Sequence, residues 1–107
     1  MPRETGPARH ERPAIDEAAL TAARDADKLL DGARERGADR WAAFLADVPD
    51  RLRDAPIVDL RRVAVRARSA YGPKGSIREA LPAELTEPFL EHLDRLLRAL
   101  ARDALSG

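Results

Sequence analysis

The sequence predicts an all-α fold, a small bundle of four main helices with one or two short connecting helices. Apolar residues recur at spacings of three and four through most of the chain, the period of one helix face. No segment alternates strictly between apolar and polar residues, as a half-buried strand does. The length of 107 residues suits one domain, so we expect all the helices to share one core.

The first helix is expected to begin at Pro13, because proline has no N–H to lose at the first helical position. Residues 1–12, rich in proline and polar residues, are predicted to be a disordered N-terminal tail, and 13–107 a single helical domain. Gly37 is expected to end the helix. The apolar face of this helix is mostly alanine, so it allows close packing and buries little area per residue. The residues of that face are Ile15, Ala19, Ala22, Ala26, Leu29 and Ala33.

The second helix is predicted to be capped by Asp39 and interrupted by Pro49. Its apolar residues are Trp41, Phe44, Leu45 and Val48. A third helix is expected to open at Pro56 and to end at Gly72 and Pro73. Its inner face is predicted from the spacing of Ile57, Leu60, Ala64, Ala67 and Tyr71.

A short helix is predicted to start at Ile77, because Ser76 and Glu79 match a capping box. Pro82 limits its length, and Thr86 is expected to cap the last helix. The apolar face of that last helix is the strongest in the chain: Phe89, Leu93, Leu96, Leu97, Leu100 and Ala104.

Composition narrows the range of functions. The chain has no cysteine, which excludes disulfides, thiol catalysis and zinc–thiolate sites. Charged residues make up 36% of the chain but sum to a net charge of zero, so we expect no nucleic-acid binding and no membrane binding. No apolar run is long enough to span a bilayer. We expect a cytoplasmic protein without a cofactor.

Residues suited to catalysis are scarce. His10 lies in the predicted tail and His92 at the edge of the last helix's apolar face, and neither has a nucleophile at a meaningful spacing. Glu87 and Glu91 lie one turn apart, but no histidine joins them in a metal-ligand pattern. We therefore expect no enzymatic activity, no catalytic residue and no metal site.

The third helix carries the candidate partner-binding surface. Val58 and Val65, seven residues apart, are predicted to point away from its inner face, and an apolar strip rimmed by arginine is typical of a protein interface. The alternative is a central helix packed on two sides. The partner is unidentified, and a homodimer through a helix face is a further alternative. The arginines that flank the strip are Arg61 and Arg68 on one side and Arg62 and Arg66 on the other.

The loop after the third helix has two interpretations. Glycine permits unusual backbone conformations, and a helix start attracts anions, so Lys74, Gly75, Ser76 and Arg78 could bind a phosphate or carboxylate in a small anion- or nucleotide-sensing protein. The alternative is a structural corner. Residues 51–78 hold eight Arg or Lys against two Asp, a net charge of +6. Acidic helices of the bundle could also neutralise that charge.

The Trp41 helix and the segments 70–72 and 75–77 together resemble a family of short, uncharacterised bacterial proteins. Members share a tryptophan-bearing helix and a Tyr-Gly-x-x-Gly-Ser signature, and the resemblance covers residues 28–81. The chain departs from the family pattern at Pro73 and Lys74, where glycine and methionine are usual, and at Arg78-Glu79, which replaces an amide–acid pair. The resemblance implies an immunity- or accessory-type protein that binds a partner.

Overall fold

In the computed structural model, which describes residues 6–106, the chain folds into α-helices and short 3-10 turns, and no strand occurs in that range. The predicted all-α bundle is confirmed. The helices are α1 (Pro13–Glu35), α2 (Asp39–Leu45), α3 (Val48–Asp54), α4 (Ile57–Arg68), α5 (Ile77–Ala80) and α6 (Ala83–Ser106). The 3-10 turns are η1 (Arg9–Glu11) and η2 (Ser69–Tyr71).

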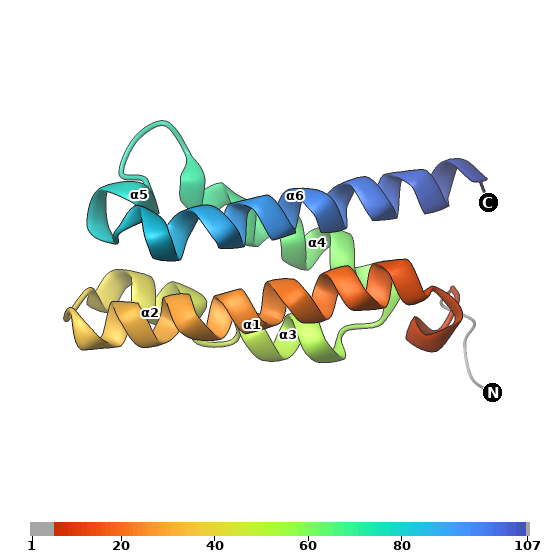
Figure 1. The fold of residues 1–107 in the computed structure, drawn as a ribbon, viewed down its shortest axis with the longest axis horizontal. Helices are drawn as coiled ribbons and strands as arrows, with labels where there is room; N and C mark the ends of the chain where they lie inside the picture. Colours follow the sequence, from red (N-terminus) through yellow and green to blue (C-terminus); the bar gives the residue numbers. More distant parts are fainter. Residues whose placement is uncertain (1–5, 107) are drawn as a thin grey trace.

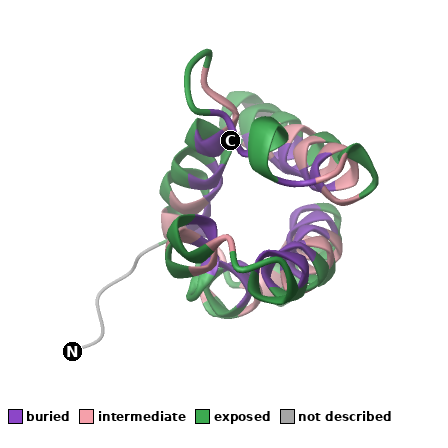
Figure 2. Ribbon diagram, turned by 90° about the vertical axis from the view of Figure 1, so that its left-hand side faces the viewer, coloured by how far each residue is buried: buried purple, intermediate pink, exposed green. Residues whose placement is uncertain are grey.

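The helices form an up-down-up-down bundle with four positions, the second of which is divided between α2 and α3. The two long helices, α1 and α6, lie antiparallel along the long axis (Figure 1). Helices α2 and α3 return along α1, and α4 packs between α3 and α6. Figure 2 shows the four positions as a ring with buried residues facing inward.

The core combines large side chains from α6 with an alanine-rich face of α1. Phe89, Leu93 and Leu96 of α6 are fully buried. On α1 the predicted stripe is confirmed as the buried face. Five alanines of α1 have no exposed surface, so neighbouring elements approach the backbone of α1 closely. They are Ala19, Ala22, Ala23, Ala26 and Ala33.

Helix boundaries in the second position differ from the prediction. Asp39 does not cap α2; it is the first helical residue, and Ala38 occupies the cap position without a side-chain hydrogen bond. Pro49 does not interrupt a helix. The break lies at residues 46–47, and Pro49 occupies the first turn of α3, where its missing N–H has no intrahelical partner to lose.

The predicted start of the last helix is also wrong. Helix α6 begins at Ala83 rather than after Thr86, and its first turn is closed by N–H groups of Leu85 and Thr86 that donate to the carbonyl of Pro82. Thr86 is fully buried within the helix. Pro88 therefore lies inside α6, near its N-terminal end.

Part of the predicted tail lies against the helical domain just before α1. Arg9–Glu11 form a 3-10 turn, and the Arg9 guanidinium contacts both the Asp16 carboxylate (2.6 Å) and the carbonyl of Ala55 (2.8 Å). These contacts attach the segment to α1 and to the α3–α4 corner. Residues 1–5 of the predicted tail lie outside the described residues.

Across residues 6–106, none of the helices combines the length and apolar character needed to cross a membrane.

Candidate functional site

The outer face of α4 is the clearest candidate surface. Ile57, Leu60, Ala64 and Ala67 turn inward and are buried, as predicted. Val58 and Val65 point away from them and are 50% and 49% exposed. We call Val58, Arg61, Arg62 and Val65 the α4 outer face. Helix α4 packs on α3 and α6 through its other sides.

The N-terminal segment borders one end of this face. A methyl group placed on Gly6 would lie 2.7 Å from Cγ1 of Val58, so the backbone at Gly6 is in contact with that side chain. Gly6 has a φ of +98°, a conformation that side-chain-bearing residues rarely adopt. The segment covers Val58 only in part, since half of that residue remains exposed.

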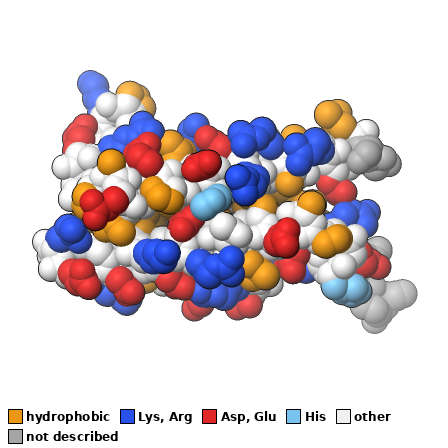
Figure 3. Space-filling view, in the orientation of Figure 1, with side chains coloured by type: hydrophobic (Ala, Val, Ile, Leu, Met, Phe, Trp, Pro, Cys, Tyr) orange, Lys and Arg blue, Asp and Glu red, His pale blue; other side chains and the backbone are white. Residues whose placement is uncertain are grey.

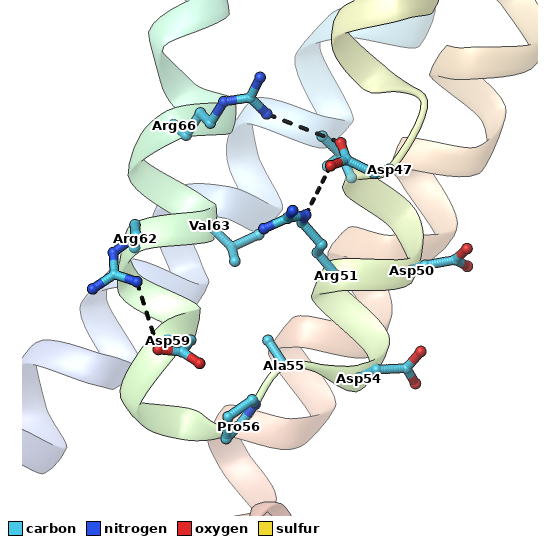
Figure 4. Close-up of a pocket in the computed structure, with 11 residues that line it drawn as sticks. Asp47, Asp50, Arg51, Asp54, Ala55, Pro56, Asp59, Arg62, Val63 and Arg66 are labelled. Carbon is cyan, nitrogen blue, oxygen red and sulfur yellow. Dashed lines mark hydrogen bonds and ion pairs between the residues drawn. The ribbon is translucent and has the colours of Figure 1, made fainter. Parts of the chain in front are cut away.

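A groove of about 460 Å³ runs between α3 and α4, next to the outer face (Figure 4). Val63 projects into it from α4, and Arg51 reaches across from α3. At one end Asp47 accepts a hydrogen bond from Nε of Arg51 (2.8 Å) and lies 4.0 Å from Arg66. Residues of both charges therefore line the groove, namely Asp47 and Asp59 with Arg51, Arg62 and Arg66, whereas the carboxylates of Asp50 and Asp54 point away from α4.

The arginines predicted to flank the apolar strip lie in different environments. Arg62 and Arg66 line the α3–α4 groove. Arg66 also lies over the Phe44 ring, 4.9 Å from its centroid. Arg68 points to the other side, where its guanidinium donates to Asp94 of α6 (2.6 Å). That bond with Asp94 raises the pKa of Arg68.

The basic block over residues 51–78 is largely neutralised by carboxylates, some on the same helix and some on neighbouring helices. Basic and acidic side chains are interspersed on the face that Figure 3 shows. Of the eight basic residues, only Arg61 and Lys74 form no ion pair with a carboxylate of residues 6–106. The pairs are Arg51 and Arg66 with Asp47, Arg53 with Asp27 and Asp50, Arg62 with Asp59, Arg68 with Asp94, and Arg78 with Glu87.

The glycine loop forms a structural corner. Ser76 caps α5, as predicted, but its hydroxyl accepts from the N–H of Arg78 (3.1 Å) rather than of Glu79. Gly75 has a φ of +60°, which favours glycine. Arg78 donates to both oxygens of Glu87 at 2.9 Å. Two of the four predicted anion-binding residues, Ser76 and Arg78, thus already have partners, and α5 is only four residues long. Lys74 remains exposed.

Tyr71 and Glu87 complete a network that joins this corner to α6. The Tyr71 hydroxyl donates to the carbonyl of Thr86 (2.5 Å), and the Thr86 hydroxyl donates to Glu87 (2.9 Å). Arg78 lies over the Tyr71 ring, 5.4 Å from its centroid. The hydrogen bond from Arg78 lowers the pKa of Glu87. Burial, followed by the nearby Glu87 carboxylate, raises the pKa of Tyr71.

The chain's single tyrosine offers a direct test of this network. We expect the Tyr71 hydroxyl to keep its proton well above pH 10.0, its ordinary pKa, because its phenolate would be half-buried beside Glu87. Since the folded-state pKa is raised, the proton's contribution to stability is complete below pH 10.0 and is lost as pH rises through the folded value. Ultraviolet titration of the folded protein measures this, with urea-unfolded protein as the control. Equal midpoints in the two states would contradict the burial.

Sequence reasoning missed Arg40. Its guanidinium lies over the Trp41 ring, 4.6 Å from the centroid, and a Cβ on Gly75 would lie 3.5 Å from its Nη1. The structure therefore brings α2 beside the glycine loop. No spacing signal links residues 35 positions apart, so only the packing of the bundle reveals this juxtaposition.

The chain matches no protein-family model, no curated protein and no solved structure. The resemblance based on Trp41 and the Tyr-Gly-x-x-Gly-Ser signature stays a prediction.

Proposed function

We propose that this chain is a small protein-binding module that docks a partner protein on the α4 outer face. One observation carries the proposal: Val58 and Val65 are two of only three large hydrophobic residues that are exposed within residues 6–105, and they lie on one helix face. The third, Leu105, lies alone near the end of α6. Two half-exposed valines, seven residues apart, present an apolar strip that a partner would remove from water.

The charges around the strip favour an acidic partner surface. Arg61 forms no ion pair with a carboxylate of the described residues, and the Arg62 side chain is 84% exposed beside Asp59 at 3.8 Å. Both guanidinium groups are therefore open to carboxylates of a partner, to which arginine can donate two parallel hydrogen bonds. We infer a partner segment with an apolar side chain between acidic ones.

The groove between α3 and α4 extends the surface. A specific interface covers about 800 Å² on each partner, more than two valines and two arginines provide. The groove lies on the Arg62 side of the strip and adds Val63, Ala55 and Pro56 as apolar contacts. An immunity- or accessory-type role is consistent with this reading. A small-anion function at residues 74–78 is the weaker candidate, because Ser76 and Arg78 already have partners.

Charged substitutions on the strip test the proposal. We expect the double variant Val58→Asp, Val65→Asp to weaken partner binding by at least about 100-fold, because it places carboxylates where apolar contacts form at the interface centre. The measurement is affinity capture from a lysate, followed by titration with the purified captured protein.

Leu105→Asp is the matched control, because Leu105 is 88% exposed and lies off the α4 outer face. It should bind like the wild type, and circular dichroism should show unchanged helicity in both variants. Retained capture by the double variant would contradict the proposal, as would equal loss in Leu105→Asp. Sedimentation of the wild-type protein alone reveals whether the partner is a second copy of the chain.

A further inference from the structure

We propose that a hollow between α2 and η2 binds a small aromatic anion, with Arg40 pairing its carboxylate or phosphate group. The hollow has a volume of about 440 Å³ and is separate from the α4 outer face. We call it the Arg40 hollow. Its lining residues are Arg40, Trp41, Ala43, Phe44, Ser69 and Ala70.

Arg40 contacts the Trp41 ring but has no hydrogen-bond acceptor among the described residues. The Trp41 ring supports its guanidinium at 4.6 Å through a cation–π contact. Within residues 6–106, the Arg40 side chain makes no hydrogen bond or ion pair, unlike Arg68 and Arg78, whose carboxylate partners lie on α6. Its N–H donors are therefore available to a ligand, and the stacked position limits the entropy lost on binding.

The wall of this hollow carries only positive charge, as does that of the adjoining hollow at Arg68, Tyr71 and Pro73, where Arg68 is already paired with Asp94. No Asp or Glu is among the lining residues of the Arg40 hollow, and Arg40 is its one charged side chain. The wall of the α3–α4 groove includes Asp47 and Asp59. Another hollow, beside Gly32, contains Asp31, Glu35 and Glu84. A bound anion in the Arg40 hollow would thus meet a positive charge without a competing carboxylate in the wall.

The other lining residues suit a flat apolar group of a ligand. The rings of Trp41 and Phe44 meet edge to face, 5.8 Å between centroids, and Ala43 and Ala70 leave room beside them. Aromatic groups prefer such offset and edge contacts. The glycine loop lies beside Arg40, since a Cβ on Gly75 would lie 3.5 Å from its Nη1.

Nuclear magnetic resonance of the single tryptophan tests the proposal, since the Trp41 indole gives one side-chain N–H signal. Phenyl phosphate and benzoate are the probes, and benzyl alcohol is the neutral counterpart. At the ligand efficiency of small compounds we expect a saturable shift with a dissociation constant on the order of 1 mM for at least one anion, and none for benzyl alcohol. Inorganic phosphate alone should bind more weakly, because it lacks the apolar body.

Two variants and a control make the outcome specific. Arg40→Gln should weaken binding about tenfold or more. Ala43→Leu should also weaken it, because a larger side chain at this exposed position fills the hollow while Arg40 remains. Arg98→Gln, at an exposed arginine of α6, should bind like the wild type. The proposal is overturned if no anion gives a saturable shift, if Arg40→Gln binds as well as the wild type, or if inorganic phosphate binds as tightly as phenyl phosphate.

Discussion

Replacing Phe89 with alanine is expected to lower the free energy of unfolding by about 3–5 kcal/mol. Phe89 is the largest side chain with no exposed surface within residues 6–105. Its removal loses the transfer free energy of the ring and leaves a cavity that helices held on all sides refill only in part. A domain of this size has a total stability of about 5–15 kcal/mol, so the variant should lose a large share of it.

Urea unfolding followed by circular dichroism measures this loss, because the helical signal reports the whole bundle. Phe89→Leu should cost much less, since it retains most of the buried apolar volume. Leu105→Ala is the surface control: Leu105 is 88% exposed, and its truncation should change stability by less than about 0.5 kcal/mol. A Phe89→Ala midpoint equal to that of Leu105→Ala would show that α6 does not pack as described.

Enlarging the alanine face of α1 is expected to produce the second-largest effect. Ala26 has no exposed surface, so Ala26→Leu must push a neighbouring helix away or adopt a strained rotamer. Overpacking of this kind typically costs about 1–3 kcal/mol. The added methyl groups are apolar, and leucine is almost as good a helix former as alanine, so a loss of stability would report lack of space alone.

The matched control is Ala101→Leu, the same change at an exposed position in the other long helix. It should leave the urea midpoint almost unchanged. If Ala26→Leu were as stable as Ala101→Leu, space would be available beside α1, and the close packing of its alanine face would be wrong.

Long periodic segments were predictable, whereas helix boundaries next to proline were not. Helix α1, 23 residues long, was identified because its apolar stripe repeats from Ile15 to Ala33, between Pro13 and Gly37. Pro49 was misjudged, because it was expected to interrupt a helix and instead lies in the first turn of α3. Proline in the first turn of a helix loses no intrahelical hydrogen bond, so it marks a helix start as readily as an interruption.

The candidate site was predictable only where one helix determines it. The exposure of Val58 and Val65 follows from the 3.6-residue period of α4. The partners of the arginines do not follow from any period: Arg68 meets Asp94, 26 residues away, and Arg78 meets Glu87, because the bundle brings α4 and α5 against α6. Local spacing likewise contains no information that Arg40 lies beside Gly75.

The pairing of α1 with α6 also bears on how the chain folds. Most neighbours in the bundle are consecutive in sequence, but the most extensive interface joins the first long helix to the last. Contacts between distant segments form only after a large loop has closed, at an entropic cost that slows folding. We therefore expect the contact between α1 and α6 to form in the rate-limiting step of folding. The contacts among the central helices α2, α3 and α4 should form earlier and be only weakly stable before that step.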